Sequence, residues 1–344
     1  MPYTESSTHT FIAPFFSIII PVYNGLSHDL EKCLDSIWTQ DIDTTLYEVI
    51  CVDDVSPDSS YEWLVKQQVA HPNLKVIRHK ENLRQGGARN TGVSHAEGVY
   101  ILFIDQDDYY HPGSLKQLYG WIQKSETSLD VVITDSAFQF KNNPHNRLQL
   151  NFGYQPVMSN TDAVKNLGWC IAPWRLCIRR SFYQEADINF VDKVMIEDID
   201  WGVKVMYYAK TVQYVPLLLI HYNKGDSSTT DNMYHDINIL TGNTLAARRV
   251  YDLAESLYIE SPIKKWVLDL ADKYFNYTCR YCFGLYCPIK ENVKLLSYIP
   301  MYHTKYILIE YAQNNATLFS IITNLSVPLF RIMRRLRRNI KSKS

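Results

Sequence analysis

A short apolar run that ends in three carboxylates, residues 100–110 (YILFIDQDDYY), places the strongest constraint on the fold. Residues 100–104 have the length and composition of a buried strand, and Asp105, Asp107 and Asp108 follow it. Carboxylates there would lie at the carboxyl edge of a sheet, where open α/β sheets bind ligands. Acidic oxygens that converge in a cleft repel one another unless a cation or hydrogen bonds compensate them. The run therefore predicts either a site for a hard divalent cation or a solvated acidic turn.

Two earlier stretches repeat this order of an apolar strand and a polar turn. Residues 15–25 (FFSIIIPVYNG) predict a strand that Pro21 ends, and residues 47–60 (YEVICVDDVSPDSS) predict one that runs into Asp53 and Asp54. Between the two predicted strands, apolar residues recur at the spacing of a helix. Strands that alternate with helices imply right-handed crossovers. We therefore predict an α/β fold with a mainly parallel sheet flanked by helices, in which several strand ends form one cleft.

Patterning divides the chain into four expected parts. Residues 1–14 predict a loose tail, 15–225 the α/β domain, 226–316 a mostly helical region, and 317–344 a basic amphipathic tail. The 344 residues and an apolar fraction of 46% allow a sizeable core. The seven cysteines are scattered, and neither a signal peptide nor a membrane-spanning stretch is evident. We therefore expect a cytoplasmic protein in a reducing compartment.

The basic tail is the second informative feature. Residues 331–344 carry seven Lys or Arg and no acid, so the rest of the chain sums to −8 against a total of −1. An apolar stretch precedes this cluster, a combination typical of interfacial anchors on anionic head groups. We expect the tail to bind the inner face of the membrane peripherally, with a solvated basic end as the alternative. The acidic main body argues against nucleic acid as a partner.

Five motifs occur in a recognisable order. They are SIIIPVYNG, EVICVDDVSPDSS, ENLRQGGARNTGVSHAEGVYILFIDQDD, PWRLCIRRSF and EDIDW, within residues 15–225. Each motif is weak alone, but their order and spacing resemble the family-2 glycosyltransferases. The resemblance implies the GT-A fold, a nucleoside-diphosphate sugar donor and inversion at the anomeric carbon.

The resemblance also assigns roles residue by residue. Some residues would bind the donor, one would hold Mn²⁺ or Mg²⁺ against the diphosphate, and a carboxylate would act as general base. The donor-binding residues are Pro21, Tyr23, Asp53, Asp54, Arg89, Asp105 and Lys224, the metal ligand is Asp107, and the base is Asp198 or, second, Glu197. Asp54 would accept a hydrogen bond from the nucleobase, because an ionised carboxylate only accepts. Asp105 would contact the ribose, and Lys224 would close over the diphosphate.

These patterns also have structural interpretations. The two acids after the second strand could form only a turn, and Glu197 and Asp198 could merely offset the dipole of a helix. Arg89 could bind the ribose or diphosphate, or it could brace the acidic loop. The chain departs from the family pattern at Val55, where Gly is common, and after Trp174, which puts the acceptor specificity rather than the reaction in question.

The function implied is transfer of a sugar, with a UDP-sugar as the expected donor, to a hydroxyl of a glycan or lipid-linked glycan during cell-surface polysaccharide synthesis. A sugar-phosphate nucleotidyltransferase is one alternative, but it needs a glycine-rich basic loop after the first strand, and PVYNG is not such a loop. A non-catalytic, membrane-associated scaffold that retains a sugar-nucleotide fold is another. The intact acids argue against it.

Overall fold

One sheet of eight strands organises the part of the chain that the computed structural model describes, residues 13–140, 155–168, 172–224, 237–257, 262–282, 289–300 and 315. The strand order is β3-β2-β1-β4-β7-β6-β8-β5. The strands are β1 (Phe16–Val22), β2 (Tyr47–Asp53), β3 (Leu74–Arg78), β4 (Tyr100–Phe103), β5 (Tyr109–Tyr110), β6 (Val131–Phe140), β7 (Leu176–Arg179) and β8 (Val212–Lys224).

The first four strands in the order are parallel. β1 pairs with β2 and β4, and β2 pairs with β3, so the carboxyl ends of β1, β2 and β4 lie at one edge of the sheet. β6 and β8 are also parallel, whereas β7 and β5 run antiparallel to their neighbours. Every residue of β1 is buried, as expected for a strand covered on both faces. The predicted α/β class with a mainly parallel sheet is confirmed.

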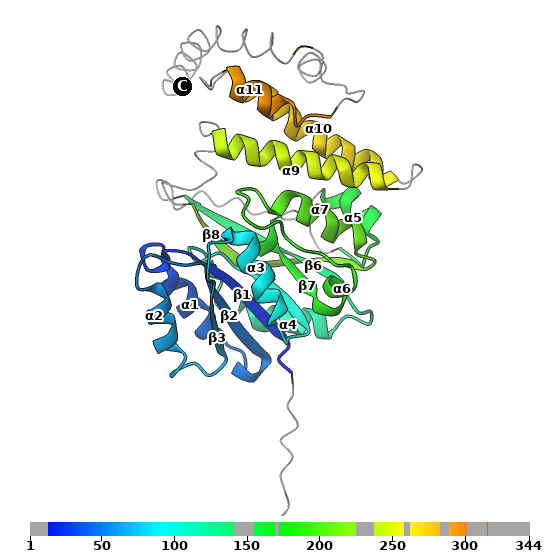
Figure 1. Ribbon diagram of the computed structural model, residues 1–344. Helices are drawn as coiled ribbons and strands as arrows, with labels where there is room; N and C mark the ends of the chain where they lie inside the picture. The colour runs from blue at the N-terminus through cyan, green and yellow to red at the C-terminus, as the bar shows by residue number, and fades with distance from the viewer. Residues whose placement is uncertain are drawn as a thin grey trace, which may run out of the picture.

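Helices cover both faces of the sheet (Figure 1). One face packs against α1, α2 and α4, and the other packs against α3, α6 and α7. The helices are α1 (Leu30–Trp38), α2 (Ser60–Gln67), α3 (Arg84–Ser94), α4 (Ser114–Gln123), α5 (Asn160–Leu167), α6 (Arg180–Glu185), α7 (Asp198–Tyr208), α9 (Ile237–Ser256), α10 (Pro262–Cys282) and α11 (Ile289–Leu296).

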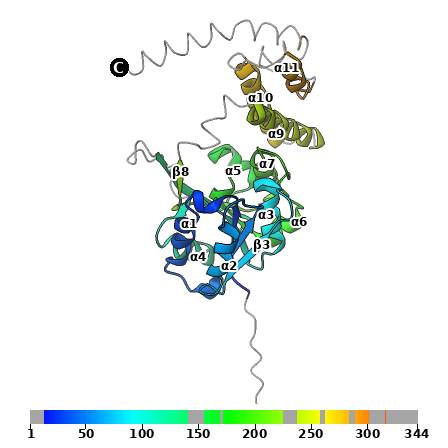
Figure 2. The ribbon, with the colours of Figure 1, turned by 60° about the vertical axis from the view of Figure 1, so that its left-hand side comes forward.

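The C-terminal helices extend this architecture through α7. Its residues Ile199 and Val203 turn away from the sheet and share a hydrophobic cluster with α9, α10 and α11. Figures 1 and 2 both show α9, α10 and α11 stacked beyond α7, on the side away from α1, α2 and α4. The expected helical C-terminal region is therefore present, and it packs directly on the helix that carries the predicted base.

The strands near the end of the sheet differ from the prediction. β6 and β8 pair with each other as far as Phe140 and Lys224. The short strand β5 was not expected, because two residues carry no periodic signal. The proposed domain boundary and the basic tail fall on residues 225–236 and 317–344, outside the described residues. Within the described residues, no helix is long and apolar enough to span a bilayer.

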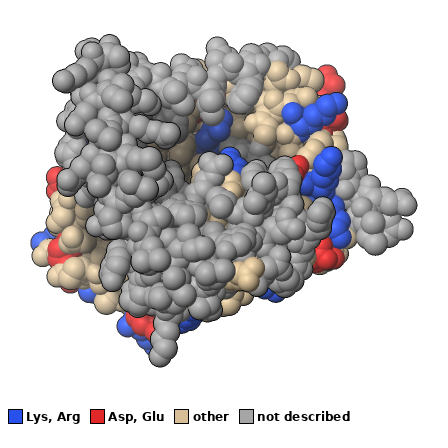
Figure 3. Space-filling model, turned by 90° about the horizontal axis from the view of Figure 1, so that it is seen from above, with Lys and Arg blue, Asp and Glu red and all other residues tan. Residues whose placement is uncertain are grey.

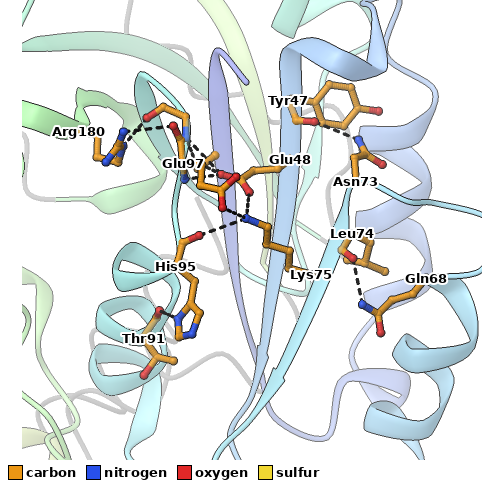
Figure 4. A network of polar contacts seen from close by, with 12 residues as sticks. Tyr47, Glu48, Gln68, Asn73, Leu74, Lys75, Thr91, His95, Glu97 and Arg180 are labelled. Atoms are coloured by element: carbon orange, nitrogen blue, oxygen red, sulfur yellow. Dashed lines mark hydrogen bonds and ion pairs between the residues drawn. The ribbon is translucent and has the colours of Figure 1, made fainter. Parts of the chain in front are cut away.

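A buried carboxylate ties the amino ends of four strands together (Figure 4). Glu48 on β2 accepts hydrogen bonds from Ser17 Oγ on β1 at 2.6 Å and from the Glu97 amide before β4 at 2.7 Å. Lys75 on β3 pairs with Glu48 at 2.7 Å and with Glu97 at 3.0 Å. A Cβ on Gly98 would lie 2.6 Å from the Ser17 nitrogen, so only glycine fits beside this network. The network fixes the sheet at the edge opposite the predicted site.

Candidate active site

A glutamine joins the end of β1 to the acidic turn after β4. Gln106 accepts a hydrogen bond from the Tyr23 amide at 2.9 Å and donates one to the Tyr23 carbonyl at 2.8 Å. The Tyr23 side chain is 51% exposed, so its ring is open to a planar ligand. Pro21, in contrast, is buried within β1 opposite Val52. The sequence carried no signal for Gln106, because its position between two acids looked like an ordinary turn.

Asp54, after β2, caps the start of α3 from across the sheet edge. Its carboxylate accepts the backbone amides of Leu83 and Arg84, each at 2.7 Å, and contacts His79 Nδ1 at 2.7 Å. These amides are the free donors of a helix N-terminus, which a carboxylate satisfies and whose dipole it complements. The structure thus gives Asp54 a structural role, the alternative considered for both acids after the second strand, and its nucleobase contact stays a prediction.

Asp53 holds the turn that follows β2. One of its oxygens accepts the Ser56 amide at 3.2 Å and lies 3.4 Å from Arg78 Nε. Ser56 Oγ in turn accepts the Asn24 amide, which joins this turn to the end of β1 at 3.0 Å. Asp53 is fully buried, and its observed contacts are those of a residue that stabilises a turn.

Arg89 bridges the acidic turn and the start of α7. Its guanidinium donates to Asp105 Oδ1 at 2.7 Å and to Glu197 Oε1 at 2.6 Å. Burial alone would lower the pKa of Arg89, but the two carboxylates raise it above its ordinary value. Gly86 lets α3 approach closely, since a Cβ there would lie 2.5 Å from the Val191 carbonyl. Of the two interpretations of Arg89, the structure shows the brace.

The acidic turn carries uncompensated negative charge. Partial withdrawal from water and the nearby Asp105 raise the pKa of Asp107 to about 6. Asp108 is buried and accepts the Asn223 amide at 2.9 Å, but its other oxygen has no hydrogen-bond partner among the described residues. Burial and the two neighbouring carboxylates raise the pKa of Asp108 well above its ordinary value. A hard cation would relieve both groups, so the donor set fits Mn²⁺ or Mg²⁺.

Asp198 is the carboxylate that remains available beside this cluster. It begins α7 and is half-buried, and burial followed by the charge of Glu197 raises its pKa to about 7. Glu197 is buried, and its carboxylate is occupied by Arg89. A carboxyl group whose pKa lies near neutrality suits proton transfer. The structure therefore favours Asp198 over Glu197 as the base.

The strand pair β5–β8 forms the side of the site next to the acidic turn. His221 is buried, stacks on Tyr109 with ring centroids 4.8 Å apart, and contacts His111 Nδ1 at 2.9 Å. This agrees with a histidine satisfied within the fold. Lys224 ends β8, where its backbone pairs with Phe140, but its side chain lies outside the described residues. Figure 3 shows a few Lys and Arg atoms near the middle of the face that is seen from above.

Known proteins resemble the chain in sequence. The family model described as Glycosyl transferase family 2 matches residues 17–185. The poly(ribitol-phosphate) beta-glucosyltransferase of Bacillus spizizenii is 41% identical over 117 residues, which are 33% of this chain and 18% of that protein. The chain spans between 18% and 62% of the length of the curated relatives that it matches first.

Solved structures resemble the fold over nearly the whole chain. Staphylococcus aureus TarS in complex with UDP matches with a TM-score of 0.63 at 18% identity and covers 92% of this chain and 91% of that one. The mannosyltransferase PcManGT of Pyrobaculum calidifontis, solved with GDP-Man and Mn²⁺, matches with a TM-score of 0.54 at 15% identity, over 91% and 88%. The family match, the motifs and the shared fold agree. Residues 17–185 of the chain belong to glycosyl transferase family 2.

Proposed function

We propose that the chain is an inverting, metal-assisted glycosyltransferase that moves a sugar from a UDP-sugar to an acceptor hydroxyl. The observation that carries this proposal is the Asp105–Arg89–Glu197 bridge, because it joins the donor-side acids to the residue before Asp198. One cleft then contains both the groups expected around a diphosphate and a carboxyl group that can take a proton. TarS, which shares the fold, was solved with UDP, and this supports uridine as the nucleoside.

Asp198 would act as the general base. Its pKa of about 7 means that roughly half of the molecules carry an ionised base at neutral pH. The ionised carboxylate accepts the proton of the acceptor hydroxyl, and the oxygen attacks the anomeric carbon from the side opposite the diphosphate, which inverts its configuration. Glu197 and Arg89 hold the position of this carboxylate by fixing the residue before it.

Asp107 would hold the metal ion, with the donor diphosphate completing the coordination. Among the described residues no three His, Cys, Asp or Glu side chains are arranged to hold a metal by themselves. This fits Mn²⁺ or Mg²⁺ sites that use one or two carboxylates together with substrate phosphates. Such an ion would neutralise charge that develops on the leaving diphosphate. Tyr23 would stack against the base, and Asp105 would meet the ribose.

The acceptor is proposed to be a cell-surface polymer or a lipid-linked glycan at the inner face of the membrane. The similar Bacillus spizizenii enzyme is named for poly(ribitol-phosphate), so that polymer is the first acceptor to test. The basic tail, residues 331–344, would hold the enzyme at anionic lipids where such acceptors are made.

A donor screen tests the function. Purified protein is mixed with UDP- and GDP-sugars, poly(ribitol-phosphate) and Mn²⁺ or Mg²⁺, and release of nucleoside diphosphate is measured with and without chelator. We expect turnover with a UDP-sugar, and its loss under chelation and in Asp107→Ala. Asp198→Asn should bind UDP normally and lose about 10²- to 10⁴-fold in kcat, the usual contribution of a general base.

The control variant is Asp41→Asn, an exposed acid that pairs with Lys116 and lies outside the site. It should turn over like the wild type. Full activity of Asp107→Ala in the presence of chelator would contradict the metal role. Loss of UDP binding in Asp198→Asn would mean that this residue belongs to the donor site.

A further inference from the structure

Arg249, from the C-terminal helices, binds the chain on both sides of Asp198. Arg249 on α9 donates from the same nitrogen to Asp200 Oδ1 at 2.8 Å and to the Ile196 carbonyl at 3.0 Å. Ile196 precedes Asp198 by two residues, and Asp200 follows it by two. Asp200 is 1% exposed, so the ion pair is shielded from solvent on that side. The contact therefore constrains the first turn of α7.

Close packing reinforces this contact. A Cβ on Gly242 of α9 would lie 3.1 Å from Ile196 Cγ1, so α9 lies directly against the segment that leads into α7. Ile199, the residue after Asp198, shares a hydrophobic cluster with Phe275 of α10, and Tyr274 packs on the same cluster. Burial and then the charge of Asp198 raise the pKa of Tyr274, which agrees with α10 facing the base.

We propose that Arg249 is a positioning residue that holds Asp198 in its catalytic orientation. The inference rests on the proposed role of Asp198 as the base. Arg249 lies outside residues 17–185, so this part of the site belongs to the C-terminal helices and not to the matched family region. Without Arg249, Asp200 would be a buried and unpaired carboxylate, a strongly unfavourable state that the chain relieves by moving. Such a movement displaces the first turn of α7 and Asp198 with it.

Charged and titratable side chains face Asp198 from the elements around it. Glu197 precedes it, Arg89 approaches from α3, Asp105 from the end of β4, and Tyr274 from α10. Substitution of Arg249 changes the chemical identity of none of these four side chains. A change in the titration of Asp198 would therefore report on its position and hydration.

Kinetics of Arg249→Met provide the first test. We expect kcat to fall about 10- to 100-fold, as for a misplaced catalytic group, while UDP binding measured by calorimetry stays at the wild-type value. The matched control is Arg248→Met, whose guanidinium pairs with Asp252 one turn along α9. Arg249→Lys, which keeps the charge, should recover part of the loss. Equal kcat in both methionine variants would overturn the proposal.

The pH profile separates positioning from a charge effect. In Arg249→Met the acidic limb of kcat should move to lower pH by about one unit, because a loosened α7 admits water to Asp198. Loss of a positive charge alone would move the limb to higher pH. A limb that stays fixed or moves up would therefore contradict the proposal.

A stability cycle tests the coupling without any turnover. The folded pKa of Asp198, about 7, lies above its ordinary value of 3.8, so its ionisation opposes folding. Wild-type stability relative to Asp198→Asn should therefore fall as pH rises from about 4 through about 7. In the Arg249→Met background this fall should be smaller and should end about one pH unit lower, as measured by thermal unfolding of the four proteins.

The two proposals fail in different ways. An unchanged pH dependence in Arg249→Met would remove the positioning role, whatever Asp198 does in the reaction. A reduced pH dependence together with full transfer by Asp198→Asn would keep the Arg249–Asp198 coupling and remove the proposed base.

Discussion

At the scale of single residues, the loops around the site contain backbone strain. Val55 and Arg84 have φ values of 62°, in the left-handed region that residues other than Gly rarely adopt. Asp54 lies between these loops: it precedes Val55, and its carboxylate accepts the Arg84 amide at 2.7 Å. A β-branched residue such as Val tolerates this conformation poorly, because its Cβ approaches the carbonyl oxygen. The contacts of Asp54 therefore hold these loops in backbone conformations that Val55 and Arg84 do not prefer.

Substitutions at Val55 measure this strain. Val55→Gly should be more stable than Val55→Ala by about 1 kcal/mol in urea unfolding, because only Gly is free of the left-handed penalty. At Val65 on α2 the order should reverse, with Ala more stable than Gly by about 1 kcal/mol, as in any exposed helix. Greater stability of Ala at both positions would show that Val55 is not strained.

The residues of the site were predictable in type, but their partners were not. The order of the motifs pointed to Asp54, Asp105 and Asp198 because each follows a strand or begins a helix, whereas Arg89 lies within α3 and was assigned by the resemblance alone. The choice between Asp198 and Glu197 needed the Arg89–Glu197 pair, which joins residues 108 positions apart. No local pattern encodes such a pair, because it depends on how α3 and α7 approach each other.

At the scale of elements, the central strands were predictable and the outer ones were not. β1, β2 and β4 are short apolar runs buried on both faces, a pattern visible in the sequence alone. The ends of β6 and β8 are stabilised by pairing with each other as far as Phe140 and Lys224, which no local apolar pattern indicates. The amino-end network around Glu48 likewise joins side chains from β1, β2, β3 and the segment before β4, so the sequence alone did not indicate it.

The Glu48 network should make stability depend on pH. Burial would raise the pKa of Glu48, but Lys75 and the hydrogen bonds it accepts lower it below the ordinary 4.5. Its ionised form thus stabilises the fold above about pH 4.5, and this stability is lost as pH falls through the folded pKa. Glu48→Gln should cost about 1–3 kcal/mol at pH 7 and less at pH 4.

A matched control is Glu97→Gln, which removes the other carboxylate on Lys75. Glu97 is half-exposed, so its loss should change the free energy of unfolding by less than about 1 kcal/mol. Chemical unfolding at pH 4, 5.5 and 7 measures both variants. A Glu48→Gln penalty that is the same at all three values would show that its charge does not contribute.

At the scale of the whole molecule, the helical region and the sheet form one folding unit around α7. One face of α7 belongs to the cluster under the sheet and the other to the cluster shared with α9 to α11. The sequence showed that both regions exist, from apolar strand runs and from helical spacing. It did not show that Arg249 of one region contacts Asp200 of the other, since 49 residues separate them.

The charge distribution of the whole chain leads to the last prediction. Residues 331–344 carry seven Lys or Arg, while the net charge of the remainder is −8 against a total of −1. An anionic membrane would therefore attract the tail and repel the body. The intact protein should cosediment with vesicles containing phosphatidylglycerol but not with phosphatidylcholine vesicles. Deletion of residues 317–344 should abolish this cosedimentation, whereas deletion of residues 1–12 should not.

Substitution of Arg334, Arg335, Arg337 and Arg338 by Gln should weaken binding by about 1 kcal/mol for each charge, and salt should weaken it further. Equal binding of the deletion variant would place any membrane contact on the acidic body, where the electrostatic attraction proposed here is absent.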